Sequence, residues 1–148
     1  MKIKAATKKD FDKVADMDVE LCLYERRFDS MIKPGEAERR SVKEVKTWKN
    51  ARAFIAKEDK DVIGFILGWT EKIPYYKAKR GFISDVFVEK EFRHKGIGES
   101  LIKNMVRWFK ERNIKDVDLN VYSKNIKALK IYKHLGFKEF DKVMRLKI

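Results

Sequence analysis

Cysteine, proline and glutamine are scarce or absent in this chain. The one cysteine, Cys22, excludes an intramolecular disulfide and fits a reducing compartment. The two prolines, Pro34 and Pro74, each mark a break between expected elements. No apolar run approaches the roughly 20 residues that a membrane span needs, and residues 1–4 lack the apolar segment of a signal peptide. We therefore expect a cytoplasmic protein.

Histidine is scarce too, and positive charge is abundant. The two histidines and the cysteine are far apart, so no metal-ligand spacing occurs and no metal site is expected. Charged residues make up 40% of the chain and the formal net charge is +13. Because the lysines are scattered, we interpret most of this charge as a solvated surface rather than a nucleic-acid interface. Together with the absent glutamine, the charge content is typical of thermophile proteins.

The 148 residues predict a single domain, 1–148, with a packed core, since 44% are hydrophobic and they are spread along the chain. Periodicity and breakers predict an α/β (α+β) fold: a central mixed β-sheet flanked by helices, in the order β-α-α-β-β-β-α-β-α-β-β. The expected strands cover residues 1–5, 53–57, 62–73, 82–88, 117–122, 137–140 and 143–148. The expected helices run from about residue 8 to 24, 36 to 48, 98 onward, and 125 to 135.

One stretch, residues 86–98, has the pattern of a phosphate site. A strand with Val86, Phe87 and Val88 ends, a loop follows, and a helix begins after Gly98. Backbone N–H groups of such a loop and the positive end of the helix dipole bind anions. Glycines at 96 and 98 remove the Cβ atoms that would hold a phosphate away. Three basic residues give the loop a basic rim: Arg93, His94 and Lys95. We expect the ligand to be a pyrophosphate.

Other phosphate-loop motifs do not fit this segment. The Walker A pattern is absent from the chain. The dinucleotide fingerprint requires a third small residue after Gly96-Ile97-Gly98, where Leu101 stands instead.

The segment resembles the acetyl-CoA signature of the GNAT superfamily of N-acetyltransferases, R/Q-x-x-G-x-G/A, in Arg93, Gly96 and Gly98. The family's C-terminal signature is matched by five further residues: Asn125, Ala128, Tyr132, Gly136 and Phe137. The expected order of elements also resembles the GNAT order over nearly the whole chain. The resemblance implies a GNAT fold, acetyl-CoA as cofactor and an amine as acceptor.

The resemblance also implies roles for individual residues. Main-chain groups of Val86, Phe87 and Val88 would bind the pantetheine arm, and Asn125 would contact the cofactor. The pyrophosphate would lie on the N–H groups of six residues, with Arg93 at the family's R/Q position: His94, Lys95, Gly96, Ile97, Gly98 and Glu99. Tyr132 would protonate the departing sulfur, since tyrosine is a recognised general acid; an ordinary core tyrosine is the alternative.

The general base is less well defined. The positions that carry a glutamate in relatives that acetylate ribosomal-protein N-termini or polyamines are Asn120 and Ser84 here. Asp85 is unusual inside an expected core strand, because buried carboxylates need partners, and it is a candidate base or substrate anchor. A carboxylate paired with a neighbouring lysine or arginine is the alternative, and a water chain in place of a dedicated base is another. Residues 24–28, where the family builds its acceptor pocket, are interpreted as a solvated helix end.

Two classes of function remain at this point. The first is acetyl-CoA-dependent acetylation of a primary amine: a protein N-terminus, a lysine, a polyamine or another small amine. The second is a non-catalytic module that senses CoA or binds nucleic acid or ribosomes, for which the chain carries no recognition motif. A homodimer through the C-terminal strands is compatible with the sequence.

Overall fold

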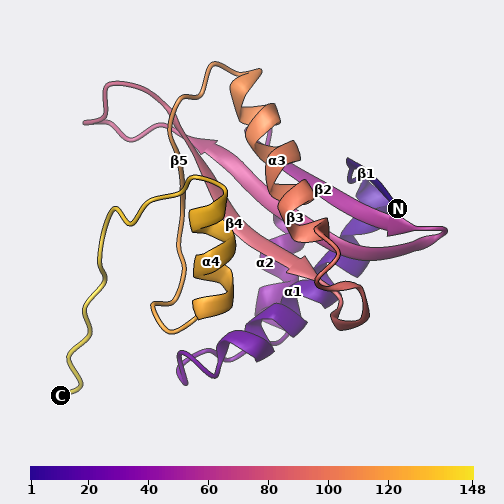
Figure 1. Cartoon of the computed structure of the whole chain (residues 1–148), viewed down its shortest axis with the longest axis horizontal. Helices are drawn as coiled ribbons and strands as arrows, with labels where there is room; N and C mark the ends of the chain where they lie inside the picture. Colours follow the sequence, from indigo (N-terminus) through magenta and orange to yellow (C-terminus); the bar gives the residue numbers. More distant parts are fainter.

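Five strands form one sheet in the computed structural model, which describes residues 1–148 (Figure 1). Their order across the sheet is β1-β2-β3-β4-β5, the order in which they occur in the chain. Neighbouring strands are antiparallel except β4 and β5, which are parallel. The strands are β1 (Lys2–Ala5), β2 (Ala51–Glu58), β3 (Asp61–Glu71), β4 (Arg80–Val88) and β5 (Val117–Leu119). The helices are α1 (Phe11–Glu25), α2 (Glu36–Val45), α3 (Ile97–Lys110) and α4 (Ile126–His134), with short 3-10 turns at Lys8–Asp10 and Lys90–Phe92.

Helices cover both faces of the sheet (Figure 1). On one face, α1 and α2 bury side chains such as Val14 and Met17 against Phe65 and Phe87. On the other, α3 buries Leu101 and Phe109 among others, and α4 packs at the edge of the same cluster. Each fully buried large side chain contributes about 1.5–3 kcal/mol to the free energy of unfolding. The expected mixed sheet flanked by helices is confirmed.

A β-bulge in β4 decides which way its second half faces. Leu67 pairs with Asp85 and Gly68 pairs with Ile83, so Ser84 is the extra residue. A bulge breaks the strict alternation of side chains and re-aims those that follow. Ile83 therefore faces α3, while Phe87 packs on the α1 side. The same shift turns Asp85 towards α1, where its carboxyl meets Asp18.

Just beyond this bulge, β4 and β5 separate. Their parallel pairing covers only Gly81, Phe82 and Ile83, which pair with residues 117–119. The rest of β4 has no neighbour along this edge, and α4 lies beside it (Figure 1). The fold thus leaves a wedge between two parallel strands of one sheet.

The prediction of two C-terminal strands, at residues 137–140 and 143–148, is wrong. Beyond Gly136 (φ +94°) the chain leaves the top of α4 and runs away from the sheet (Figure 1). The segment shows the apolar alternation of a strand, yet it pairs with no sheet edge, and side chains such as Val143 and Met144 are exposed. Alternation favours a strand only where a neighbour supplies the ladder hydrogen bonds. The homodimer expected through these strands stays a prediction.

The remaining expected elements are present, with bounds that differ by a few residues. The main differences are that β5 ends at Leu119, three residues early, and that α2 ends at Val45 rather than near 48. No helix of the structure is both long and apolar enough to cross a membrane.

Candidate active site

The loop between β4 and α3 presents a row of unpaired backbone N–H groups. Arg93 still donates its N–H to the Lys90 carbonyl, and the first helical bond runs from the Ser100 N–H to the Gly96 carbonyl. Between them, the N–H groups of residues 94–99 donate to no group of the protein. His94 (φ +64°) and Gly96 (φ +75°) are both left-handed, and such turns bring successive N–H groups to one side. This backbone geometry is the kind that binds anions, and the expected anion site stays a prediction.

The two glycines of the loop leave open space beside its backbone. A Cβ added to Gly96 would meet nothing within 4 Å, and one added to Gly98 would approach only Val88, at 3.8 Å. This open space lies at the positive end of α3, whose dipole favours an anion. The main-chain groups of residues 94–99 therefore have the geometry and the helix dipole that favour an anion.

The side chains of the loop contribute less than its backbone. The Arg93 Nε donates to the Val88 carbonyl at 2.8 Å, so this guanidinium fastens the loop to the end of β4. His94 and Lys95 are exposed. The Glu99 carboxylate lies 2.9 Å from the Lys103 Nζ and 3.8 Å from the His134 Nε2. The second of these contacts links the start of α3 to the end of α4. The basic rim thus consists of His94 and Lys95, with Arg93 turned inward.

The free edge of β4 offers a second set of main-chain groups. Glu89 donates its N–H to Ile63 across β3, and hydrogen-bonded and free positions alternate along an antiparallel pair. The N–H and C=O groups of Val86 and Val88 therefore point to the edge that β5 has left, while those of Phe87 face β3. Since Arg93 already binds the Val88 carbonyl, both main-chain groups of Val86 and the N–H of Val88 remain for a ligand.

Helix α4 positions Asn125 and Tyr132 near the β4 edge. The Asn125 Oδ1 accepts the Ala128 N–H at 3.3 Å, so this side chain is the N-cap of the helix. Tyr132 is partly buried and packs edge-to-face on Phe137, with ring centroids 5.9 Å apart. Burial, with a smaller effect of the nearby carboxylates Glu25 and Asp85, raises the pKa of Tyr132 to about 12. Its hydroxyl is therefore protonated at neutral pH and can donate a proton.

Asp85 has no lysine or arginine partner. Burial is the main cause that raises its pKa, with a contribution from the charge of Glu38. The carboxyl it faces belongs to Asp18, which is fully buried and accepts no hydrogen bond at either oxygen. Two facing carboxyl groups repel each other when both are ionised, and burial with Glu38 and Asp85 nearby raises the pKa of Asp18. The alternative of an Asp85–lysine pair is wrong.

Glu25 lies at the end of α1 and belongs to the same region. Burial, then the charges of Asp85 and Glu38, raise its pKa to about 7. The interpretation of residues 24–28 as a solvated helix end is therefore wrong for Glu25, which is partly buried, and correct for Arg26 and Arg27, which are exposed. The sequence signal was the spacing of Asp18, Cys22 and Glu25 on one stripe of α1. Only the fold brings that stripe to Asp85.

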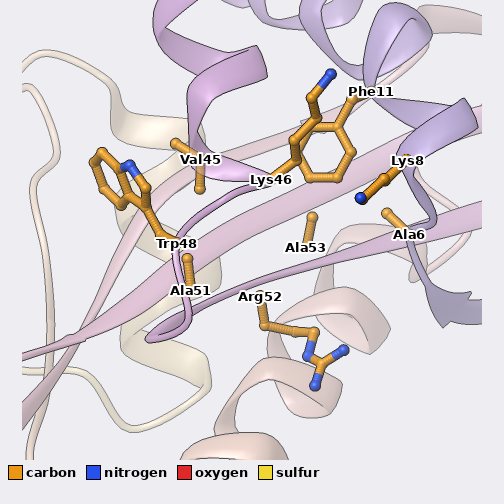
Figure 2. A pocket seen from close by; sticks show the side chains of 9 residues that line it. All are labelled: Ala6, Lys8, Phe11, Val45, Lys46, Trp48, Ala51, Arg52 and Ala53. Carbon is orange, nitrogen blue, oxygen red and sulfur yellow. The ribbon is translucent and has the colours of Figure 1, made fainter.

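A pocket lined by residues from the start of α1, the end of α2 and β2 is separate from the loop and the carboxyl groups described so far (Figure 2). Phe11, Val45 and Trp48 give it an apolar lining. Arg52 points away from these side chains (Figure 2), and its guanidinium lies 5.9 Å from the ring centroid of Trp108. Besides Arg52, its titratable side chains are the lysines Lys8 and Lys46, and no carboxylate, cysteine or histidine lines it.

The chain belongs to the acetyltransferase (GNAT) family, whose model matches residues 22–137. An N-alpha-acetyltransferase of Sulfurisphaera tokodaii is 34% identical over 103 residues, which cover 64% of this chain and 60% of that protein. An uncharacterized N-acetyltransferase of Archaeoglobus fulgidus is 28% identical over 137 residues and 89% of both chains. The chain spans 60%, 40% and 49% of the length of three curated relatives that it matches.

Solved structures share the fold. The tetramutant of the BH1408 protein from Bacillus halodurans superposes with a TM-score of 0.87 at 18% identity, over 100% of both chains. The structure of AAC(6')-Iy in complex with the bisubstrate analog CoA-S-monomethyl-acetylneamine gives a TM-score of 0.77 at 19% identity, over 99% of this chain and 97% of that one. The GNAT fold expected from the resemblance is confirmed.

Proposed function

We propose that this chain transfers the acetyl group of acetyl-CoA to a primary amine. The proposal rests on one arrangement of groups. Free N–H groups at residues 94–99 and the free edge of β4 at Val86 are suited to bind the cofactor. The protonated Tyr132 and the carboxyl groups of Glu25 and Asp85 are suited to transfer protons. Family membership and relatives named N-acetyltransferases support it. Acetyl-CoA supplies the thioester carbonyl that an amine can attack.

Each residue has a defined task in this scheme. The N–H groups of residues 94–99 hold the pyrophosphate, and main-chain groups of Val86 and Val88 bind the pantetheine arm. The Val86 N–H is suited to donate to the thioester oxygen as negative charge develops on it. Tyr132 donates its proton to the departing sulfur.

Proton removal from the acceptor falls to Glu25. An ammonium group must lose a proton before its nitrogen can attack, and a base works best when its pKa lies near the working pH. The pKa of Glu25, raised to about 7, meets this condition. Asp85, which lies beside Glu25, anchors the substrate. The acceptor is an amine of a protein N-terminus, a lysine, a polyamine or another small molecule.

The test is acetyl-CoA binding by isothermal titration, followed by an assay of CoA release with a panel of amines. Gly98→Glu places a carboxylate on the loop in backbone that any residue adopts, and we expect it to abolish binding. Ser41→Glu adds the same charge on the exposed face of α2 and should bind like the wild type. Binding that survives in Gly98→Glu would refute the loop assignment. Tight binding without acetylation of any amine would instead indicate a CoA-sensing module.

A further inference from the structure

Four carboxyl groups meet between α1, α2 and β4. Asp18 and Glu25 come from α1, Glu38 from α2 and Asp85 from β4. The ligand atoms of Asp18, Cys22 and Glu38 lie within 4.8 Å of one another. We name Asp18, Glu25, Glu38 and Asp85 the acidic cluster.

No cation of the protein neutralises this cluster. The chain has 36 lysines and arginines, yet none of them forms an ion pair with any of the four residues. Asp18 is fully buried, and neither of its oxygens accepts a hydrogen bond. Buried carboxylates are costly unless paired, so such a group is stable only when it holds a proton or meets a cation from outside.

The cluster adjoins the reaction site. Glu25 and Asp85 are the two charges that act on Tyr132. Asp18 faces Asp85, and its carboxyl lies within 4.8 Å of that of Glu38 on α2. The cluster therefore extends from the point of acetyl transfer into the space between α1 and α2.

One ammonium does not account for all four groups. In the proposed reaction the acceptor ammonium first gives a proton to Glu25, and its neutral nitrogen forms a C–N bond to the acetyl carbon. The C–S bond then breaks, the sulfur takes the proton of Tyr132, and the nitrogen gives its second proton to the tyrosinate oxygen, which leaves the neutral amide. The nitrogen that attacks is neutral by then. It therefore supplies no positive charge that would allow the buried carboxyl groups of Asp18 and Asp85 to ionise.

We propose that Asp18, Glu38 and Asp85 form a subsite for a second positive charge of the acceptor, so that the preferred substrate is a primary amine with a further ammonium or guanidinium group a few bonds away. This inference rests on the proposed acetyltransferase function. A chain with a net charge of +13 repels such a substrate at long range, so a local acidic subsite is what allows it to bind. A Zn²⁺ ion on Cys22 and two carboxylates is the competing occupant.

The experiment compares α,ω-diamines, from 1,3-diaminopropane to 1,6-diaminohexane, with monoamines of equal carbon number. We expect the wild type to show a kcat/KM for the best diamine on the order of a hundredfold above its monoamine. Asp18→Asn and Glu38→Gln should each reduce this ratio about tenfold or more. Asp18→Asn keeps the shape of the buried side chain, and Glu38→Gln alters the partly exposed rim should the first variant not fold. Glu20→Gln, on the exposed face of α1, should keep the ratio.

Direct titration separates this inference from the proposed function. The same amines are titrated onto the CoA complex of each variant. Equal kcat/KM for diamines and monoamines in the wild type would overturn the subsite and leave amine acetylation standing. Diamine binding that requires Asp18, without acetylation of any amine, would support the subsite and refute the acetyltransferase. Equimolar Zn²⁺ binding that displaces the diamine and is lost in Cys22→Ser would overturn the subsite in favour of a metal site.

Discussion

The carboxyl group of Asp18 on α1 meets that of Asp85 on β4, and no lysine or arginine pairs with either. This contact exists because the bulge at Ser84 turns Asp85 towards α1. Burial and like charge raise the pKa of Asp18, so the folded protein holds a proton that the unfolded chain releases above its ordinary pKa of 3.8. Stability from this group is complete below about pH 4 and falls as pH rises towards the raised pKa.

We therefore expect Asp18→Asn to stabilise the protein at pH 8. The asparagine cannot ionise, and its amide can donate hydrogen bonds to Asp85 and Glu38. The free energy of unfolding should rise by roughly 1–3 kcal/mol at pH 8 and change little at pH 4. Urea unfolding at both pH values measures it, with Glu20→Gln as the control that shifts neither. A variant less stable than the wild type at pH 8 would mean that Asp18 is ionised and that its charge is stabilised in the folded protein.

A second prediction concerns Glu25 and the pH dependence of acetylation. A base must be deprotonated to accept a proton, so kcat/KM should rise with pH through about 7, the pKa of Glu25. The acceptor's own ammonium group adds a separate rise at its own pKa. Glu25→Gln should lose the limb near 7 and reduce kcat/KM by about 10²-fold or more. Initial rates of CoA release from pH 5.5 to 9 test this. An unchanged profile in the variant would remove Glu25 from the reaction.

A third prediction concerns the packing of α3 on the sheet. A Cβ on Gly81 would come within 2.8 Å of the Phe109 ring, which is fully buried. Gly81→Ala should therefore lower the free energy of unfolding by about 1–3 kcal/mol, the usual cost of overpacking. Gly35→Ala is the matched control, because a Cβ there meets nothing within 4 Å. Urea unfolding of both variants gives the comparison, and equal stabilities would contradict the observed closeness of α3 to β4.

The sequence predicts the parts of this site that are local. The strand, the loop and the helix around Gly96 follow one another in the chain, so their pattern is visible without the fold. The acidic cluster is not local, since Asp18 and Asp85 meet only through the β-bulge at Ser84. The prediction of two strands in the C-terminal segment is wrong for a related reason. Its apolar alternation indicates a strand, but whether a sheet edge accepts it depends on where α4 ends.

The last prediction assigns Tyr132 as a proton donor rather than a core residue. Its pKa, raised to about 12, means that the hydroxyl stays protonated, so the wild type should show no loss of activity due to this group below about pH 11. Tyr132→Phe keeps the packing on Phe137 and removes only the hydroxyl. We expect kcat to fall by about 10²-fold or more, with the acetyl-CoA Kd unchanged, because the proton is needed only as the sulfur departs. Stopped assays of CoA release and isothermal titration separate the two quantities. If kcat stays within a few-fold of the wild type, the hydroxyl has no part in the reaction, and Tyr132 serves the core alone.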